Sequence, residues 1–145
     1  MHNEWREVVA EWRGESGFIG RNHAGVKVQM GSCEGQSGIS PMEMLLLGVA
    51  GCTGMDVASI LLKKRQKLTG LQVLVRGKRA NEVPRVYTEI EVTYLLRGED
   101  LEPDAVERAI QLSEEKYCSA SAMMRATAQL RSIYRILSLE EQEEA

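Results

Sequence analysis

The side chains best suited to chemistry in this sequence are three widely spaced cysteines, Cys33, Cys52 and Cys118. A cysteine thiolate is a nucleophile that can pass through a sulfenic acid to a disulfide. No two of the cysteines form a Cys-x-x-Cys pair, and His2 and His23 stand apart from them, so a zinc site is not expected. An odd, sparse set also differs from the dense cysteine framework of small secreted domains. We therefore expect free thiols in a reducing cytoplasm.

Cys52 lies in the most apolar stretch of the sequence, LLLGVAGCTGMDVASILLKKRQ at residues 45–66. By itself, a cysteine in such a stretch more often packs as a small hydrophobic residue than reacts. Its place is about three turns into the predicted helix, too far from the N-terminus for the helix dipole to help it ionise. A reactive Cys52 therefore needs a nearby cation, because burial alone raises the pKa of a thiol.

Asp56 follows Cys52 by one helical turn. A carboxylate beside a thiol raises the thiol pKa, so Asp56 is not an obvious activator. We expect it to be a buried polar residue that is hydrogen-bonded within the helix or at a dimer interface. Arg85 and Arg125 are both candidates for its partner, and the sequence does not choose between them.

Cys118 opens the segment CSASAMM, at or near the start of a predicted helix, where a thiolate is favoured. The alternative is a helix-capping residue with no chemistry. Cys33 lies in the Gly/Ser-rich loop at residues 31–40, beside Glu34. We expect it to be an incidental exposed thiol.

The helix that carries Cys52 has a clear start signal. Ser40 can cap it, Pro41 suits the first helical position, and Glu43 completes a Ser-x-x-Glu capping box. The pattern predicts a helix from residue 40 to about Lys64, with KLTG at residues 67–70 ending it.

This predicted helix is apolar on nearly every side. A membrane span would place Asp56 near the bilayer centre at a cost of about 2.5–3.5 kcal/mol, and amphipathic strands flank the segment. A helix that is apolar all round must then be buried all round. One sheet covers only one face, and Gly48, Gly51 and Gly54 allow close approach of another backbone. We expect a homodimer with this helix at its centre, and no membrane partner.

The other elements follow from periodicity and turn signals. Short strands are predicted at residues 4–12, 18–22 and 25–30, long alternating strands at 71–80 and 85–98, helices at 102–117 and 118–128, and a closing strand at 130–137. Strands and helices in blocks are typical of an α+β fold with antiparallel sheets. We divide the single expected domain, 1–145, into N-terminal strands and loop (1–39), central helix (40–65), strands and helices with the second cysteine (70–137) and an acidic tail (138–145).

Composition sets further limits. A chain of 145 residues is the size of one domain, and 43% hydrophobic with 27% charged residues is typical of a globular protein. A net charge of −3 argues against nucleic acid as a partner. The N-terminal segment MHNEWREVVAEW has no apolar signal core. We expect a cytoplasmic protein with no cofactor and no metal.

Four segments taken together carry a family resemblance: SPMEMLLLGVAGCTGMDV, LTGLQVLVRGKR, VPRVYTEIEVTY and AVERAIQLSEEKYCSASAMM. They resemble the OsmC family of osmotically inducible and organic hydroperoxide resistance proteins. The resemblance covers most of the chain. It implies an OsmC-like α+β fold that forms an intertwined homodimer around a long central helix. It also implies a cysteine pair that reduces peroxides, with a lipoyl-type or other external dithiol as reductant.

Carried over residue by residue, the resemblance makes Cys52 the peroxidatic thiol and Cys118 the resolving thiol. Hydroperoxide-reducing members carry a glutamate directly after the proline that starts the helix, where it helps to hold an active-site arginine. Here that position is Met42, and the glutamate is one place later, at Glu43, about 100° around the helix. Glu43 is therefore a candidate for either a catalytic or a capping role.

The supporting arginine of the family comes from the N-terminal strands. Arg21 is the preferred candidate for it here, Arg13 is the other, and a surface-strand role is the alternative for Arg21. The second motif reads Cys-Ser instead of the Cys-Pro common in the hydroperoxide branch, which places this chain nearer the less characterised OsmC-like branch.

The function that follows is a thiol-dependent peroxidase for organic hydroperoxides, with hydrogen peroxide as a second candidate substrate, that cycles through a Cys52–Cys118 disulfide in oxidative stress defence. The alternative is a non-catalytic protein of the same fold that binds a small apolar ligand at the dimer interface. In that case the two cysteines would be an inert lining of the pocket.

Overall fold

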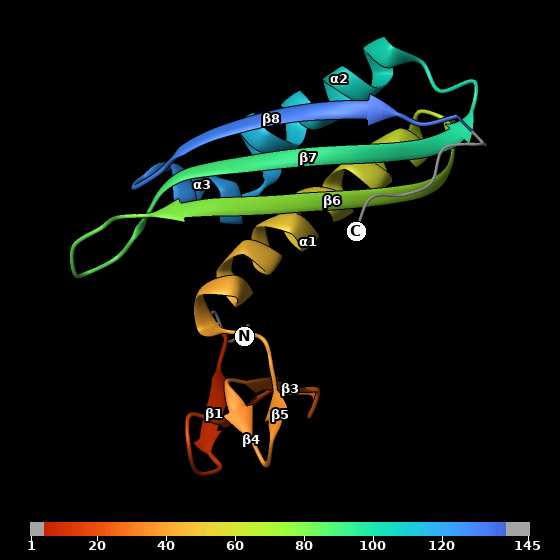
Figure 1. Cartoon of the computed structure of the whole chain (residues 1–145). Helices are drawn as coiled ribbons and strands as arrows, with labels where there is room; N and C mark the ends of the chain where they lie inside the picture. The colour runs from red at the N-terminus through yellow and green to blue at the C-terminus, as the bar shows by residue number, and fades with distance from the viewer. Residues whose placement is uncertain (1–4, 139–145) are drawn as a thin grey trace. The chain divides into compact units, whose positions relative to one another are not determined.

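The structure of the chain is a computed structural model that describes residues 5–138 (Figure 1). The chain divides into two compact units, Met1–Leu45 and Leu46–Ala145, and each is described by itself. The expectation of a single domain over 1–145 stays a prediction. Apart from Ser138, the predicted acidic tail lies outside the described residues.

The first unit is built on a three-stranded antiparallel sheet. Its strands are β1 (Val8–Trp12), β2 (Phe18–Asn22) and β3 (Lys27–Met30), in the order β1-β2-β3. All three were expected from the sequence. The following segment was predicted to be a loop because it is rich in glycine and serine. It contains a small hairpin, in which β4 (Ser32–Cys33) pairs with β5 (Gln36–Ser37).

The long helix α1 runs from Pro41 to Lys63, as predicted (Figure 1). The Ser40 Oγ accepts a hydrogen bond from the Glu43 amide at 3.0 Å, and the Glu43 carboxylate accepts one from the Ser40 amide at 2.8 Å. The predicted capping box is therefore formed. The helix ends in a turn in which Arg65 adopts a positive φ of 60°.

The second unit contains a sheet of long strands in the order β6-β7-β8. Strand β6 (Lys67–Arg79) pairs antiparallel with β7 (Tyr87–Glu99), which confirms the long hairpin. Strand β6 begins at Lys67, so the segment at 67–70 that was expected only to end the helix is already strand. Strand β8 (Gln129–Ile136) pairs parallel to β7, so the expectation of a wholly antiparallel sheet is wrong. The helical segments between β7 and β8 form the crossover that a parallel pair needs.

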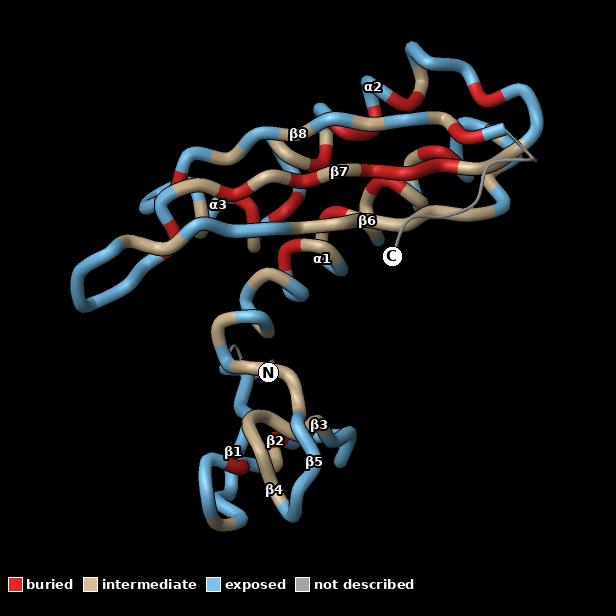
Figure 2. The backbone as a smooth tube through the Cα atoms, viewed as in Figure 1, coloured by how far each residue is buried: buried red, intermediate tan, exposed pale blue. Residues whose placement is uncertain are grey.

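Those helical segments are α2 (Pro103–Leu112), a single π-helical turn η1 (Ser113–Tyr117) and α3 (Ser119–Arg125). Together with α1 they lie over one face of the sheet (Figure 1). Strand β7 runs through the middle of the core, and Figure 2 shows a continuous buried stretch along it. The largest fully buried side chains are Tyr94, Leu61, Ile90, Leu96, Val49, Val57, Val92 and Val106.

Within one chain, α1 is buried along one face only. Its buried residues recur at helical spacing: Val49, Thr53, Val57 and Leu61. On the same side Gly54 lets the helix approach β6, because a Cβ there would lie 3.3 Å from the Val73 side chain. The opposite side exposes large apolar residues, with Met55 at 77% exposure. A helix buried on all sides is therefore not found in the single chain.

The length and composition of α1 would by themselves suit a membrane span. The core helix of a globular domain passes the same test, and α1 contacts the sheet: the Thr53 hydroxyl lies 2.8 Å from that of Tyr94, and Gly54 lies against Val73. Its buried face also carries a hydroxyl group, that of Thr53. The unit is thus an α+β domain without a clear membrane-spanning segment.

Candidate functional site

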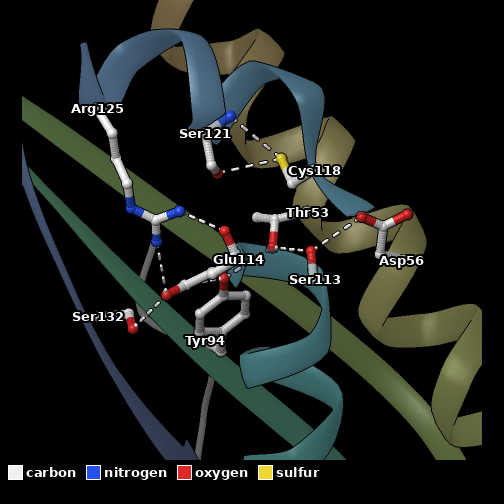
Figure 3. A network of polar contacts seen from close by, with 9 residues as sticks. All are labelled: Thr53, Asp56, Tyr94, Ser113, Glu114, Cys118, Ser121, Arg125 and Ser132. Carbon is white, nitrogen blue, oxygen red and sulfur yellow. Dashed lines mark hydrogen bonds and ion pairs between the residues drawn. The ribbon is translucent and has the colours of Figure 1, made fainter. Parts of the chain in front are cut away.

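Cys118 is the N-cap residue of α3, as its place in the sequence predicted. Its backbone is extended, with φ −78° and ψ 102°, and the chain enters it directly from the π turn η1. The Cys118 Sγ accepts two hydrogen bonds from Ser121, one from the amide at 3.3 Å and one from the hydroxyl at 3.1 Å (Figure 3). Both residues are buried, at 2% and 1% exposure.

The second thiol of the predicted pair, Cys52, lies within hydrogen-bonding reach of Cys118. Burial raises the pKa of the Cys118 thiol, the two bonds from Ser121 oppose that effect, and the neighbouring Cys52 raises the pKa further. The net direction is upward, so Cys118 favours the protonated thiol. Cys52 is only half-buried and is therefore the more accessible of the two sulfur atoms.

Hydrogen bonds between neighbouring residues hold the two cysteines together. The Thr53 hydroxyl, next to Cys52 in the sequence, lies 2.7 Å from the Ser113 hydroxyl. The Ser113 carbonyl in turn accepts the amide of Cys118 at 2.7 Å, which closes the wide turn of η1. Such π turns occur often at functional sites. Here the turn ties the residue after Cys52 to the backbone of Cys118.

The structure gives Asp56 a partner that the sequence had not suggested. The Ser113 hydroxyl donates to its carboxylate at 2.9 Å. Arg85 instead donates to the carbonyl of Ala80, and Arg125 pairs with Glu114. Asp56 is therefore hydrogen-bonded, but it is half-buried and its partner lies on η1 instead of within its own helix. In the contacts given above, Arg85 and Arg125 bind other groups.

The same network continues to the sheet. The Tyr94 hydroxyl lies 2.8 Å from that of Thr53 and donates to the Glu114 carboxylate at 2.5 Å (Figure 3). Glu114, whose side chain is 10% exposed, also accepts from Ser132 at 2.9 Å and lies 3.7 Å from the Arg125 guanidinium. Arg125 further donates to the Glu114 carbonyl.

The number of hydroxyl protons limits how many of these oxygen–oxygen contacts can be hydrogen bonds. Four oxygen–oxygen contacts link the carboxylates of Glu114 and Asp56 through the hydroxyls of Tyr94, Thr53 and Ser113. Three hydroxyl groups supply three protons. While both carboxylates only accept, Thr53 can donate to one of its two neighbours and not to the other. A further donor at either end would complete the chain.

Tyr94 makes the stability of this unit depend on pH at alkaline values. Burial first, and then the hydrogen bond to Glu114, raise the pKa of the Tyr94 hydroxyl above its usual value near 10. Above about pH 10 the unfolded chain loses this proton while the folded chain keeps it, so stability falls by about 1.4 kcal/mol per pH unit. We expect urea midpoints between pH 9 and 11 to fall less steeply in Tyr94→Phe than in the wild type. Equal slopes would contradict this.

The other predicted site residues belong to the first unit. Arg21 lies on β2 and forms an exposed ion pair with Glu11 at 3.8 Å, and Arg13 pairs with the same carboxylate at 3.3 Å. Glu43 is held in the capping box, and its hydrogen bonds from Ser40 lower its pKa. The structure does not relate these side chains to Cys52, so a supporting role for Arg21 or Glu43 stays a prediction.

Cys33 is half-buried in the small hairpin, and its thiol faces the Arg13 carbonyl at 3.6 Å, so it is less exposed than expected. Among residues 5–138, no group of three or more His, Cys, Asp or Glu side chains is placed to hold a metal ion. The chemistry that this arrangement can perform is that of two adjacent thiols.

The comparison with known families decides the assignment. The family model described as OsmC-like protein matches residues 34–132, which include both thiols and the whole polar network. The chain belongs to the OsmC-like family. The α+β fold that the sequence resemblance implied is thereby confirmed.

The chain is also similar to individual proteins over most of its length. Protein YhfA of Escherichia coli strain K12 is 36% identical over 121 residues, which cover 83% of this chain and 90% of YhfA. A hypothetical protein from Aquifex aeolicus VF5 has a crystal structure with a TM-score of 0.79 and 34% identity, over 94% of this chain and 100% of that one. The organic hydroperoxide resistance protein OhrB of Bacillus subtilis shares the fold, with a TM-score of 0.62 and 18% identity over 90% and 98% of the two chains.

Sequence reasoning placed Cys118 at the start of a helix, as the structure has it, but missed the network beside the two thiols. The hydroxyls of Thr53, Tyr94 and Ser113 come from three elements, and nothing in their spacing predicts that they meet. The one available signal was Ser113, which opens η1 and continues the helical spacing of the buried α2 residues Val106, Ala109 and Ile110. A serine at such a position requires a buried hydrogen-bond partner.

Proposed function

We propose that this OsmC-like protein is a thiol peroxidase that reduces organic hydroperoxides through Cys52 and Cys118. The observation that carries the proposal is the placement of the two thiols within hydrogen-bonding reach of each other in one compact unit. Membership of a family whose solved structures include organic hydroperoxide resistance proteins supports a redox role.

In the proposed cycle Cys52 attacks first, because it is half-buried while Cys118 is almost fully buried. The Cys52 thiolate attacks one oxygen of the hydroperoxide, the O–O bond breaks, and the alkoxide takes up a proton to leave as the alcohol. Cys52 is then a sulfenic acid. The Cys118 thiol condenses with it, which forms the disulfide and releases water. An external dithiol reduces the disulfide by two exchange steps and is itself oxidised.

A cation is still needed to favour the Cys52 thiolate. We retain Arg21 for this role, and Glu43 as the residue that would orient it, as the family resemblance implies. The capping contacts of Glu43 support a structural role for that residue as well. In the cell we place the cycle in the cytoplasm, where external dithiols are kept reduced.

The assay that tests the proposal follows consumption of an organic hydroperoxide, such as cumene hydroperoxide, with dithiothreitol or dihydrolipoamide as the dithiol. We expect turnover by the wild-type protein well above the rate with dithiol alone. No consumption above that background would reject the peroxidase and favour a non-catalytic protein that binds an apolar ligand.

We also propose that the protein acts as a homodimer with α1 at its centre. The face of α1 away from the sheet is exposed and apolar along Leu47, Met55 and Leu62. Gly48 and Gly51 leave that face shallow, since nothing lies within 4 Å of a Cβ at either position. Sedimentation equilibrium at micromolar concentration should give the mass of two chains, and Met55→Lys should shift the protein towards monomer. A wild-type monomer at these concentrations would contradict the proposal.

A further inference from the structure

The hydroxyl of Ser121 donates a hydrogen bond to the sulfur of Cys118. The Oγ–Sγ distance is 3.1 Å, the amide of the same residue lies 3.3 Å from the sulfur, and Ser121 is 1% exposed. A buried serine could satisfy its hydroxyl on a nearby carbonyl. Here it is directed at a thiol, and the bond is worth most when that sulfur carries negative charge, because hydrogen bonds to ionised groups are the stronger ones.

Cys118 carries negative charge at one point of the proposed cycle. When a dithiol attacks the Cys52–Cys118 disulfide, the attacked sulfur forms a mixed disulfide and the other leaves as a thiolate. Exchange is faster when the leaving thiol has the lower pKa. Burial raises the pKa of the Cys118 thiol, and the two hydrogen bonds from Ser121 are the contacts that oppose this rise. They therefore make Cys118 a better leaving thiolate than it would be without them, while Cys52 is the more exposed sulfur for attack.

We infer that Ser121 is a catalytic residue of the reductive half-reaction: its hydroxyl stabilises Cys118 as the leaving thiolate when the dithiol attacks the more exposed Cys52. In the first step the reductant thiolate bonds to the Cys52 sulfur, the disulfide bond breaks, and its electron pair goes to Cys118. In the second step the other thiol of the reductant displaces Cys52 and closes the oxidised dithiol. The two electrons come from the external dithiol. The inference deepens the proposed function and rests on its cysteine pair.

The test uses the full chain with Cys33→Ser, which removes the third thiol. The disulfide is formed with diamide, without peroxide, and its reduction by dithiothreitol is followed between pH 6 and 9. We expect Ser121→Ala to slow reduction by about threefold to tenfold at neutral pH, because the leaving thiolate loses one donor. Ser121→Thr, which keeps the hydroxyl, should restore most of the rate. Ser119→Ala, an exposed serine at the start of the same helix, is the matched control and should reduce at the parent rate.

Two further readouts separate this role from a packing role. Glutathione, a monothiol, stops the exchange at the mixed disulfide, and peptide mass after acid quenching should locate it on Cys52. In a Cys52→Ser background, Ser121→Ala should move the pH profile of Cys118 alkylation to higher pH.

A reduction rate unchanged by Ser121→Ala, a glutathione adduct mainly on Cys118, or no disulfide with diamide would each overturn the inference. A wild type that consumes no peroxide but shows the Ser121 effect would reject the peroxidase and leave the inference standing.

Discussion

Cys52→Ser should reduce dithiol-dependent consumption of organic hydroperoxides to the uncatalysed background. A serine hydroxyl at this position cannot replace the thiolate, which is the nucleophile that breaks the O–O bond. Cys118→Ser should behave differently, because Cys52 can still react once. We expect it to consume about one equivalent of hydroperoxide per chain and then to turn over slowly, if the sulfenic acid is reduced directly.

Cys33→Ser is the matched control, since Cys33 lies in the first unit and its thiol faces a backbone carbonyl. It should keep wild-type kinetics under the same conditions. Full activity in Cys52→Ser would show that another group performs the chemistry. Equal losses in the Cys33 and Cys52 variants would indicate general damage to the fold.

The largest stability effect is expected at Glu114. Glu114→Ala removes the acceptor of Tyr94 and Ser132 and the partner of Arg125. A buried donor left without a partner costs about 1–3 kcal/mol, so we expect a loss of about 3 kcal/mol in the free energy of unfolding. Because Arg125 is 37% exposed, its charge stays in contact with water and adds little.

Glu114→Gln tests whether the number of protons in the network affects stability, because glutamine keeps the contacts of Glu114 and adds a donor. Its amide can donate to the Tyr94 hydroxyl, which can then donate to Thr53, so that all four contacts carry a proton. We therefore expect Gln to cost about half as much as Ala. Glu115→Ala, at the exposed neighbouring position, should change stability by less than about 0.5 kcal/mol. Urea unfolding measures the free energy of unfolding of all three variants. Equal losses of stability in Glu114→Gln and Glu114→Ala would show that the number of protons in the network is not important.

Most elements of the fold could be predicted because local patterns are strong. The capping box at Ser40 and Glu43 predicted the start of α1, and the alternation along residues 85–98 predicted the strand β7. The parallel pairing of β8 was missed. Strand periodicity shows which side chains share a face, but it carries no information on the direction of a neighbouring strand.

The cysteine pair could be named only through the family resemblance, because 66 positions separate Cys52 from Cys118 in the sequence. The polar network was not predicted from the sequence for a related reason. Thr53, Tyr94 and Ser113 meet through tertiary packing and a π turn, and a π turn has no reliable sequence signal. Asp56 was expected to be buried and bonded within its helix or at a dimer interface, but it is half-buried and accepts from Ser113 of η1.

The central claim is that Cys52 and Cys118 form a redox pair, and intact mass tests it most directly. After treatment with one equivalent of cumene hydroperoxide, wild-type protein should lose about two hydrogens as the disulfide forms, and the loss should require both cysteines. Cys118→Ser should instead gain about one oxygen at Cys52. An unchanged wild-type mass, or the same two-hydrogen loss in Cys52→Ser, would contradict the account.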